Sequence, residues 1–162
     1  MNRRERLGSA LGPMGNLFLL VTLPELRRRR LTYLAFYALQ RSIAEADRSD
    51  QTENAYTESQ LTGETQLSDY ETSRACSLLR NKGLVSIRRS VEDRRIRLLI
   101  PTEQGRRVSR EVLSQAGEKL WTSIPKAGRI RRVKKITDLL RDANRTMHGK
   151  WQLSFFDRDL GP

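Results

Sequence analysis

Two helix-start motifs in close succession constrain the fold of this chain more than any other feature. Thr57 with Gln60 forms the first motif, and Ser68 with Glu71 forms the second. In such a capping box, the hydroxyl of the first residue accepts a hydrogen bond from the backbone N–H three residues later, and the Glu or Gln side chain accepts one in return. Each motif therefore begins a helix, and the first helix must be short. Two short helices joined by a tight turn are typical of a helix-turn-helix.

The residue pattern changes from helical to strand spacing at Gly83. Glycine is favoured at the left-handed residue that ends a helix. Residues 84–89 and 95–100 then alternate as two strands joined by a polar turn, and Pro101 stands at the end of the second strand. The apolar side of the preceding helix carries three residues at helical spacing: Thr72, Cys76 and Leu79. The pattern predicts a β-hairpin directly after the second helix.

Longer helices are predicted on both sides of this central region. Pro24 suits the first position of a helix, and helical spacing of apolar residues continues from there to Ala46. Thr102 caps a long helix, and residues 125–128 separate it from a last helix. The fold class is therefore mostly α with a small β-hairpin.

The charge is strongly basic and unevenly distributed. Lys and Arg number 31 against 19 Asp and Glu, which gives a net charge of +12. The acids concentrate in residues 45–73, whereas residues 74–110 hold eleven basic and three acidic side chains. A basic excess suits a phosphate-bearing partner, because each bound phosphate releases counterions. A merely solvated basic surface is the alternative, and charge alone leaves both open.

The second helix and the hairpin carry the candidate contacts to DNA. Such a helix can lie in the major groove, and an arginine-bearing hairpin beside it can reach the minor groove. Asp93 is placed to pair with Arg95 and to leave Arg94 projecting, while Glu71 is assigned to the cap in preference to a cytosine contact. The predicted DNA contacts are Ser68, Tyr70, Ser73, Arg74, Ser77, Arg88, Arg89, Arg94, Arg95 and Arg97.

Catalytic and metal chemistry have little support in the sequence. One cysteine and one histidine leave no zinc-ligand cluster, and there is no nucleophile–base set or phosphate-binding loop. We therefore expect no enzyme, no catalytic residue, no metal and no cofactor. Cys76 is interpreted as a buried structural thiol rather than an oxidant sensor. The apolar run at 17–21 is too short to span a bilayer, and no cleavage site follows it, so we expect a cytoplasmic, nucleoid-associated protein without a membrane partner.

The region from Thr57 to Val108 resembles the multiple-antibiotic-resistance regulator (MarR) family of winged helix-turn-helix transcription factors. The segments that carry the resemblance are TESQLTGET, LSDYETSRACSLLRNKGLV, EDRRIRLL and PTEQGRRV. The resemblance implies a homodimer whose two hairpins, or wings, flank duplex DNA at a pseudo-palindromic operator. It also implies an Asp93–Arg95 ion pair that supports the wing, with Arg94 in the minor groove. The implied domains are residues 1–50 for N-terminal dimerisation, 51–101 for DNA binding, and 102–162 for the C-terminal dimerisation helices and tail.

The resemblance further implies a crevice for a small aromatic effector between the dimer helices and the DNA-binding region. Tyr33, Phe36 and Tyr37 are candidates to line it, although they suit a core equally, and core is the preferred interpretation. Arg27–Arg30 contacts either flanking DNA or the acids at 45–58. The aromatic tail at 151–156 packs across the dimer or against the last helix, or it stacks on bases. The predicted function is a ligand-responsive transcriptional repressor. A sequence-tolerant architectural DNA-binding protein or an RNA-binding winged-helix protein is the alternative.

Overall fold

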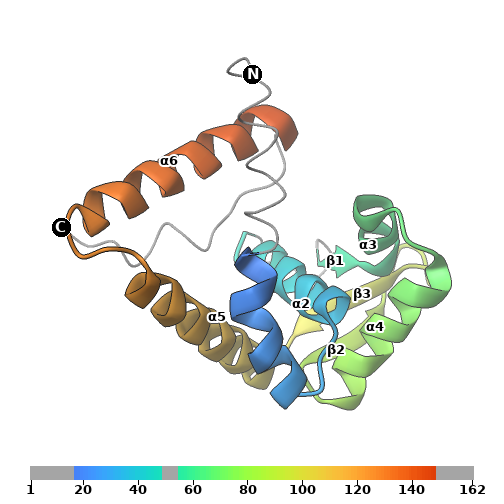
Figure 1. The fold of residues 1–162 in the computed structure, drawn as a ribbon. Helices are drawn as coiled ribbons and strands as arrows, with labels where there is room; N and C mark the ends of the chain where they lie inside the picture. The colour runs from blue at the N-terminus through green and yellow to red at the C-terminus, as the bar shows by residue number, and fades with distance from the viewer. Residues whose placement is uncertain (1–16, 49–54, 149–162) are drawn as a thin grey trace. The chain divides into compact units, whose positions relative to one another are not determined.

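The computed structural model describes residues 17–48 and 55–148, and the chain divides at Leu120 into two units (Figure 1). The fold is mostly α with one small sheet, as the sequence predicts. A helix over 17–28 comes first. The remaining elements are α2 (Tyr33–Ala46), β1 (Tyr56–Thr57), α3 (Glu58–Thr65), α4 (Asp69–Asn81), β2 (Val85–Arg89), β3 (Arg97–Pro101), α5 (Glu103–Ser123) and α6 (Arg129–His148).

Both predicted capping boxes are present and set the helix-turn-helix. The Thr57 hydroxyl accepts from the backbone N–H of Gln60 at 3.0 Å, and the Gln60 side chain accepts from the N–H of Thr57 at 2.8 Å. The Ser68 hydroxyl accepts from the N–H of Glu71 at 3.3 Å, and the Glu71 carboxylate accepts from the N–H of Ser68 at 3.0 Å. Gln66 ends α3 in the left-handed conformation. The assignment of Glu71 to the cap is confirmed.

The sheet has three antiparallel strands in the order β1-β3-β2. The predicted hairpin is present, and in its register Arg89 lies opposite Arg97 and Val85 opposite Pro101. The sequence did not predict β1, in which Tyr56 pairs with Leu99. A strand of two residues is too short to show an alternating pattern, so only the pairing itself reveals it.

A single hydrophobic core joins the sheet to the helices around it. Its fully buried side chains come from the helix over 17–28 and from α2, β1, α3, α4, β3 and α5, and include Leu26, Phe36, Leu39, Tyr56, Leu61, Leu79, Leu99 and Val112. Cys76 is buried in the same core, as predicted. Gly83 has a φ of +68°, which confirms the left-handed exit from α4. The core therefore holds β1, α3, α4, β2 and β3 as one body, called here the central lobe.

The predicted continuous helix from Pro24 to Ala46 is wrong. Pro24 lies inside the helix over 17–28, and the chain leaves that helix through Arg30, whose φ is +52°. The N–H of Leu31 donates to the carbonyl of Leu26 at 2.8 Å and closes the helix end. Thr32 then accepts from the N–H of Ala35 at 3.1 Å and starts α2 as its N-cap. Apolar residues keep a helical spacing on both sides of this turn, so the sequence pattern did not reveal the break.

The second unit contains the end of α5 and α6. Gly128, with a φ of +71°, lies in the predicted interruption at 125–128, just before α6. Arg129 donates to the carbonyl of Ile124 at 2.9 Å, and its guanidinium lies 5.0 Å from the centre of the Trp121 ring. Among the α6 side chains that the structure describes, three large apolar ones are exposed: Ile130, Ile136 and Leu139. The aromatic tail at 151–156 lies outside the described residues. None of the helices described here is both long and apolar enough to cross a membrane.

Candidate nucleic-acid interface

The outer side of α4 presents the residues that the sequence assigned to DNA. Tyr70 is 73% exposed and Arg74 is exposed, whereas Ser73 and Ser77 are half-buried. Ser68 is also exposed at the start of the helix. The opposite side of α4, with Thr72, Ala75, Cys76 and Leu79, is buried in the core. Helical periodicity thus separates an inner packing face from an outer polar face.

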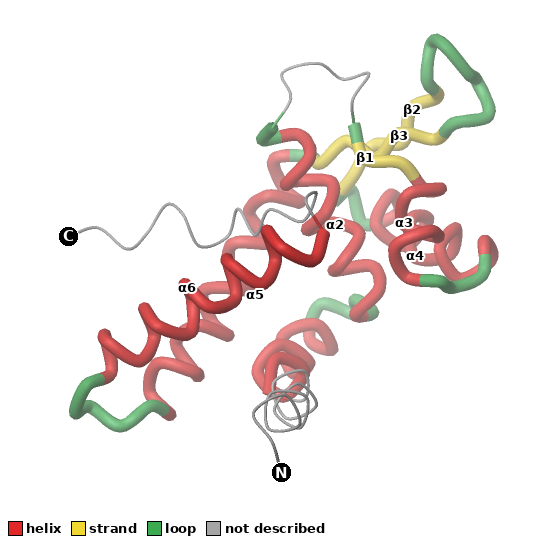
Figure 2. Tube along the Cα trace, turned by 90° about the horizontal axis from the view of Figure 1, so that it is seen from above, coloured by secondary structure: helices red, strands yellow, loops and turns green. Residues whose placement is uncertain are grey.

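The β2–β3 hairpin forms the wing, residues 85–101, and its loop extends away from the helices (Figure 2). Asp93 accepts a hydrogen bond from the backbone N–H of Arg95 at 2.9 Å. The N–H of Ile96 donates to the carbonyl of Asp93 at 2.9 Å and closes the turn. The Asp93 carboxylate therefore shapes the turn through the backbone, and an ion pair with the Arg95 side chain stays a prediction. Four arginines of the wing are exposed: Arg88, Arg89, Arg94 and Arg95.

A basic groove of about 550 Å³ lies along the wing. Its lining consists of one apolar side chain and six arginines: Ile87, Arg80, Arg88, Arg89, Arg94, Arg95 and Arg97. None of these lining residues is acidic. Arg80 comes from the last turn of α4 and was not among the predicted contacts. Several positive charges around one concave surface attract a polyanion more strongly than the same charges spread apart.

Arg97 differs from the other arginines of the wing because it is held inside the central lobe. Its Nη1 atom lies 2.9 Å from Oε2 of Glu58 and 3.3 Å from Oγ of Ser73. Two of the predicted DNA contacts, Ser73 and Arg97, therefore bind each other. Sequence reasoning did not predict these contacts, since both Glu58 and Ser73 lie far from Arg97 along the chain.

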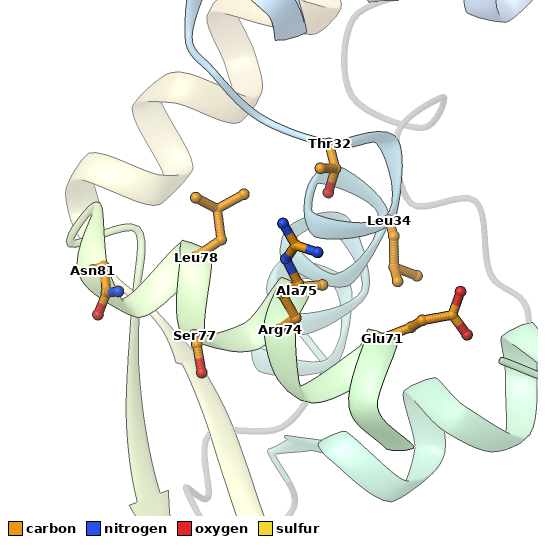
Figure 3. Close-up of a pocket in the computed structure, with 8 residues that line it drawn as sticks. All are labelled: Thr32, Leu34, Glu71, Arg74, Ala75, Ser77, Leu78 and Asn81. Atoms are coloured by element: carbon orange, nitrogen blue, oxygen red, sulfur yellow. The ribbon is translucent and has the colours of Figure 1, made fainter. Parts of the chain in front are cut away.

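A second cavity, of about 570 Å³, lies between the start of α2 and α4 (Figure 3). Figure 3 shows Arg74 extending from α4 toward Thr32 at the start of α2. The cavity is lined mostly by apolar surface with a polar rim; its residues are Thr32, Leu34, Glu71, Arg74, Ala75, Ser77, Leu78 and Asn81.

The residues that the sequence proposed for an effector crevice lie elsewhere. Phe36 is 1% exposed and belongs to the hydrophobic core. The Tyr37 hydroxyl donates to Glu64 at 3.0 Å, and the half-exposed Tyr33 ring makes an edge contact with Phe18. None of the three lines the cavity in Figure 3. The alternative of a core role is the correct one for Phe36.

A carboxylate on α3 binds the central lobe to α2. Glu64 accepts hydrogen bonds from the hydroxyls of Tyr56 at 2.7 Å and Tyr37 at 3.0 Å, and from Arg41 at 2.8 and 3.0 Å. Burial raises the pKa of Glu64, but the hydrogen bonds and the positive charge of Arg41 outweigh it, so the pKa is lowered overall. Burial together with Glu64 raises the pKa of both tyrosines. Glu64 is therefore a charged anchor that positions the helix-turn-helix.

A helix-turn-helix with an outward polar face, followed by an arginine-rich hairpin on the same core, defines a winged-helix DNA-binding fold. Among the described residues, no group of three or more His, Cys, Asp or Glu side chains is placed to hold a metal ion.

Comparison with solved structures places this fold within one group of proteins. A MarR-family transcriptional regulator from Rhodococcus sp. RHA1 superposes with a TM-score of 0.63 at 19% identity, over 88% of this chain and 95% of that one. Rv1404 from Mycobacterium tuberculosis gives a TM-score of 0.64 at 16% identity, over 88% and 95%. CouR from Rhodococcus jostii RHA1, bound to p-coumaroyl-CoA, gives 0.57 at 20% identity, over 85% and 90%.

No family model and no curated protein sequence matches the chain. The chain has the winged-helix fold of MarR-family transcriptional regulators, as the sequence resemblance implied.

Proposed function

We propose that this protein is a sequence-specific, duplex-DNA-binding transcriptional regulator that acts as a homodimer. The observation that carries the proposal is the groove of six arginines on the wing, beside the exposed polar face of α4. Similarity of fold to transcriptional regulators supports the same class of function. The proposal includes repression, because a dimer seated on an operator blocks access of the polymerase.

In the proposed complex, α4 enters the major groove and the wing follows the adjacent backbone. Arg74 is the candidate base contact, because it is exposed on α4 and a guanidinium can donate two hydrogen bonds to guanine. Arg94, exposed at the loop of the wing, is the candidate for the minor groove, where the potential is most negative in narrow segments. The other exposed arginines of the groove, Arg80, Arg88, Arg89 and Arg95, bind phosphates, which give affinity without sequence information.

The dimer is proposed because apolar side chains remain exposed on helices outside the central lobe. Leu20 in the helix over 17–28 is 70% exposed, and Ile130 of α6 is 74% exposed. A second copy of the chain buries such patches through a two-fold interface. The two copies of α4 then meet half-sites about one helical turn apart on a pseudo-palindromic operator.

The test of this function is selection of bound fragments from genomic DNA, followed by binding to the selected site at several salt concentrations. We expect Arg94→Ala to weaken binding and to reduce the salt slope by about one. We expect Arg74→Ala to relax the preference at one base position by about 1–3 kcal/mol. Arg110→Ala serves as the control, since Arg110 lies on α5 and pairs with Glu103 in solvent. Binding that Arg94→Ala leaves unchanged would contradict a wing contact.

Competition binding experiments distinguish this function from the two alternatives, an architectural DNA-binding protein and an RNA-binding protein. A sequence-tolerant architectural protein binds the selected site and random duplex with nearly equal affinity, whereas a specific regulator prefers its site by about 10³-fold or more. An RNA-binding protein is displaced by structured RNA more readily than by duplex DNA.

We further propose that the cavity between α2 and α4 binds a small aromatic effector. Its apolar floor of Leu34, Ala75 and Leu78 suits an aromatic ring, and Arg74 at the rim suits an anionic group. An effector in this cavity takes Arg74 away from DNA. We expect p-coumaroyl-CoA, the ligand in the CouR structure, or p-coumarate to lower DNA affinity, and DNA to lower the effector's affinity by the same factor. Titration calorimetry with and without the DNA site measures both. If the effector binds with the same affinity in the presence and in the absence of the DNA site, it does not bind in this cavity.

A further inference from the structure

We propose that Glu58 and Arg97 are positioning residues for DNA recognition, which fix the wing against α4, and that Arg97 does not itself bind DNA. This inference rests on the proposed function. It assigns a different role to one arginine of the basic groove and a new role to an acid outside it.

One guanidinium links the wing to both helices of the helix-turn-helix. Arg97 begins β3 at the base of the wing, opposite Arg89. Its Nη1 atom lies 2.9 Å from the carboxylate of Glu58, the first residue of α3, and 3.3 Å from the hydroxyl of Ser73 in α4. Because the wing has no other ion pair to the helix-turn-helix among the described residues, this contact is the charged link between them.

The burial of Glu58 indicates that its carboxylate is part of the structure of the lobe. The side chain of Glu58 is 14% exposed and that of Arg97 is 35% exposed. The Oε2 atom of Glu58 is buried and accepts no hydrogen bond within the described structure, so the facing guanidinium supplies its compensation. A buried carboxylate without its partner is strongly unfavourable, and this holds Arg97 in place.

The other arginines of the wing have a different environment. Arg88, Arg89, Arg94 and Arg95 are exposed, and within the described residues none of their side chains has an acidic partner. They are free to meet phosphates, whereas the Nη1 atom of Arg97 already contacts Glu58 and Ser73. A DNA contact through that atom would compete with Glu58, and the positive charge of Arg97 is already balanced by the carboxylate.

The two roles of Arg97 predict opposite effects of one substitution. Glu58→Gln removes the carboxylate and the ion pair but adds no bulk. If Arg97 positions the wing, Glu58→Gln lowers affinity for the selected DNA site, because the wing is no longer held in register with α4. If Arg97 binds phosphate directly, the same substitution frees its charge and raises affinity.

The experiment measures affinity for the selected site and for random duplex, over a range of salt, for Glu58→Gln, Arg97→Gln and the double variant. We expect each single substitution to lower specific affinity about tenfold, and the double variant to lose little more, as coupled residues do. We expect the ratio of specific to random affinity to fall while the salt slope stays as in the unsubstituted protein. Arg89→Gln is the matched control, because it removes an exposed wing charge opposite Arg97 and should reduce the slope by about one.

An unchanged or higher affinity for Glu58→Gln, or a reduced salt slope for Arg97→Gln, would overturn the positioning role. Thermal unfolding of each variant shows whether it is folded; if Arg97→Gln is not, Glu58→Gln alone decides through the sign of its effect. Failure of the proposed function looks different, because then neither Arg94→Ala nor Arg89→Gln changes DNA binding.

Discussion

Glu64 shows how a single side chain can hold two helices and a strand together. It receives hydrogen bonds from Tyr37 and Arg41 of α2 and from Tyr56 of β1. The Arg41 guanidinium also lies 5.2 Å from the centre of the Tyr56 ring. The pair between Arg41 and Glu64 is 11% and 20% exposed, so solvent screens it little.

We therefore expect Glu64→Gln to lower the free energy of unfolding by about 2–4 kcal/mol at pH 7, because the Arg41 guanidinium then stays buried without the carboxylate that balances its charge. The pKa of Glu64 is lowered from its ordinary value of 4.5. Its contribution is thus complete above pH 4.5 and is lost as the pH falls through the lowered pKa. Urea unfolding from pH 7 to pH 3 should show the difference from the unsubstituted protein shrinking in acid. Glu103→Gln is the control, since the Glu103–Arg110 pair is exposed and contributes little.

Cys76 is expected to be chemically inert in the folded protein. Burial raises the pKa of the Cys76 thiol to about 12; the charge of Glu58 raises it and that of Arg97 lowers it. The thiolate is the reactive form, so the folded protein offers almost none of it at neutral pH. Iodoacetamide, followed by mass spectrometry, should modify Cys76 only at the rate at which the protein unfolds. Rapid modification without denaturant would instead indicate an exposed, redox-active thiol.

Elements whose signals are local in the chain could be predicted, and those that depend on distant partners could not. The two capping boxes lie at the starts of α3 and α4, and Gly83 lies between α4 and the hairpin. These local signals were enough to predict α3, α4 and the hairpin. The strand at Tyr56 depends on Leu99, and the ion pair of Arg97 depends on Glu58, so neither was. The break at Arg30 was missed because apolar spacing continues across it.

Two glycines of α5 give an internal comparison of packing at the element scale. A Cβ atom at Gly105 would lie 2.1 Å from the carbonyl oxygen of Leu84, whereas nothing lies within 4 Å of one at Gly117. We expect Gly105→Ala to destabilise the fold by about 1–3 kcal/mol through overpacking. We expect Gly117→Ala to stabilise it by up to about 1 kcal/mol through helix propensity. Thermal unfolding of both variants measures this, and equal effects would mean that α5 does not pack closely on Leu84, the residue before β2.

At the scale of the whole molecule, the distribution of charge and the order of the helices and hairpin could be predicted from the sequence. Which arginines are open to a phosphate could not. The basic excess in residues 74–110 pointed to the surface that carries the groove. Charge counts cannot distinguish an arginine open to phosphate from one engaged with a carboxylate, because that depends on burial. For Phe36, the preferred interpretation from the sequence was a core role, and the residue lies in the core.

The proposed dimer predicts that its C-terminal helix is needed for association. Deleting residues from 127 onward removes α6 with its exposed Ile130, Ile136 and Leu139. We expect the shortened protein to be a monomer with weakened binding to the two-half-site DNA, and to keep weak binding to a single half-site. Size-exclusion chromatography with light scattering, at several concentrations, measures the mass. A dimer of the shortened protein would assign the interface to the N-terminal helices alone.

The contacts of Thr102 limit where this protein can bend. Its hydroxyl donates to the carbonyl of Gly83 at 2.6 Å and accepts from the N–H of Gly105 at 3.0 Å, while its own N–H donates to Leu84 at 3.1 Å. The exit of α4 and the first turn of α5 are thereby fastened to one residue, and a rotation of α5 at this point must carry α4 with it. In the proposed dimer, we therefore expect a change in the separation of the two copies of α4 to originate at another joint. The left-handed turn at Arg30 is the position at which we would introduce crosslinks to test this.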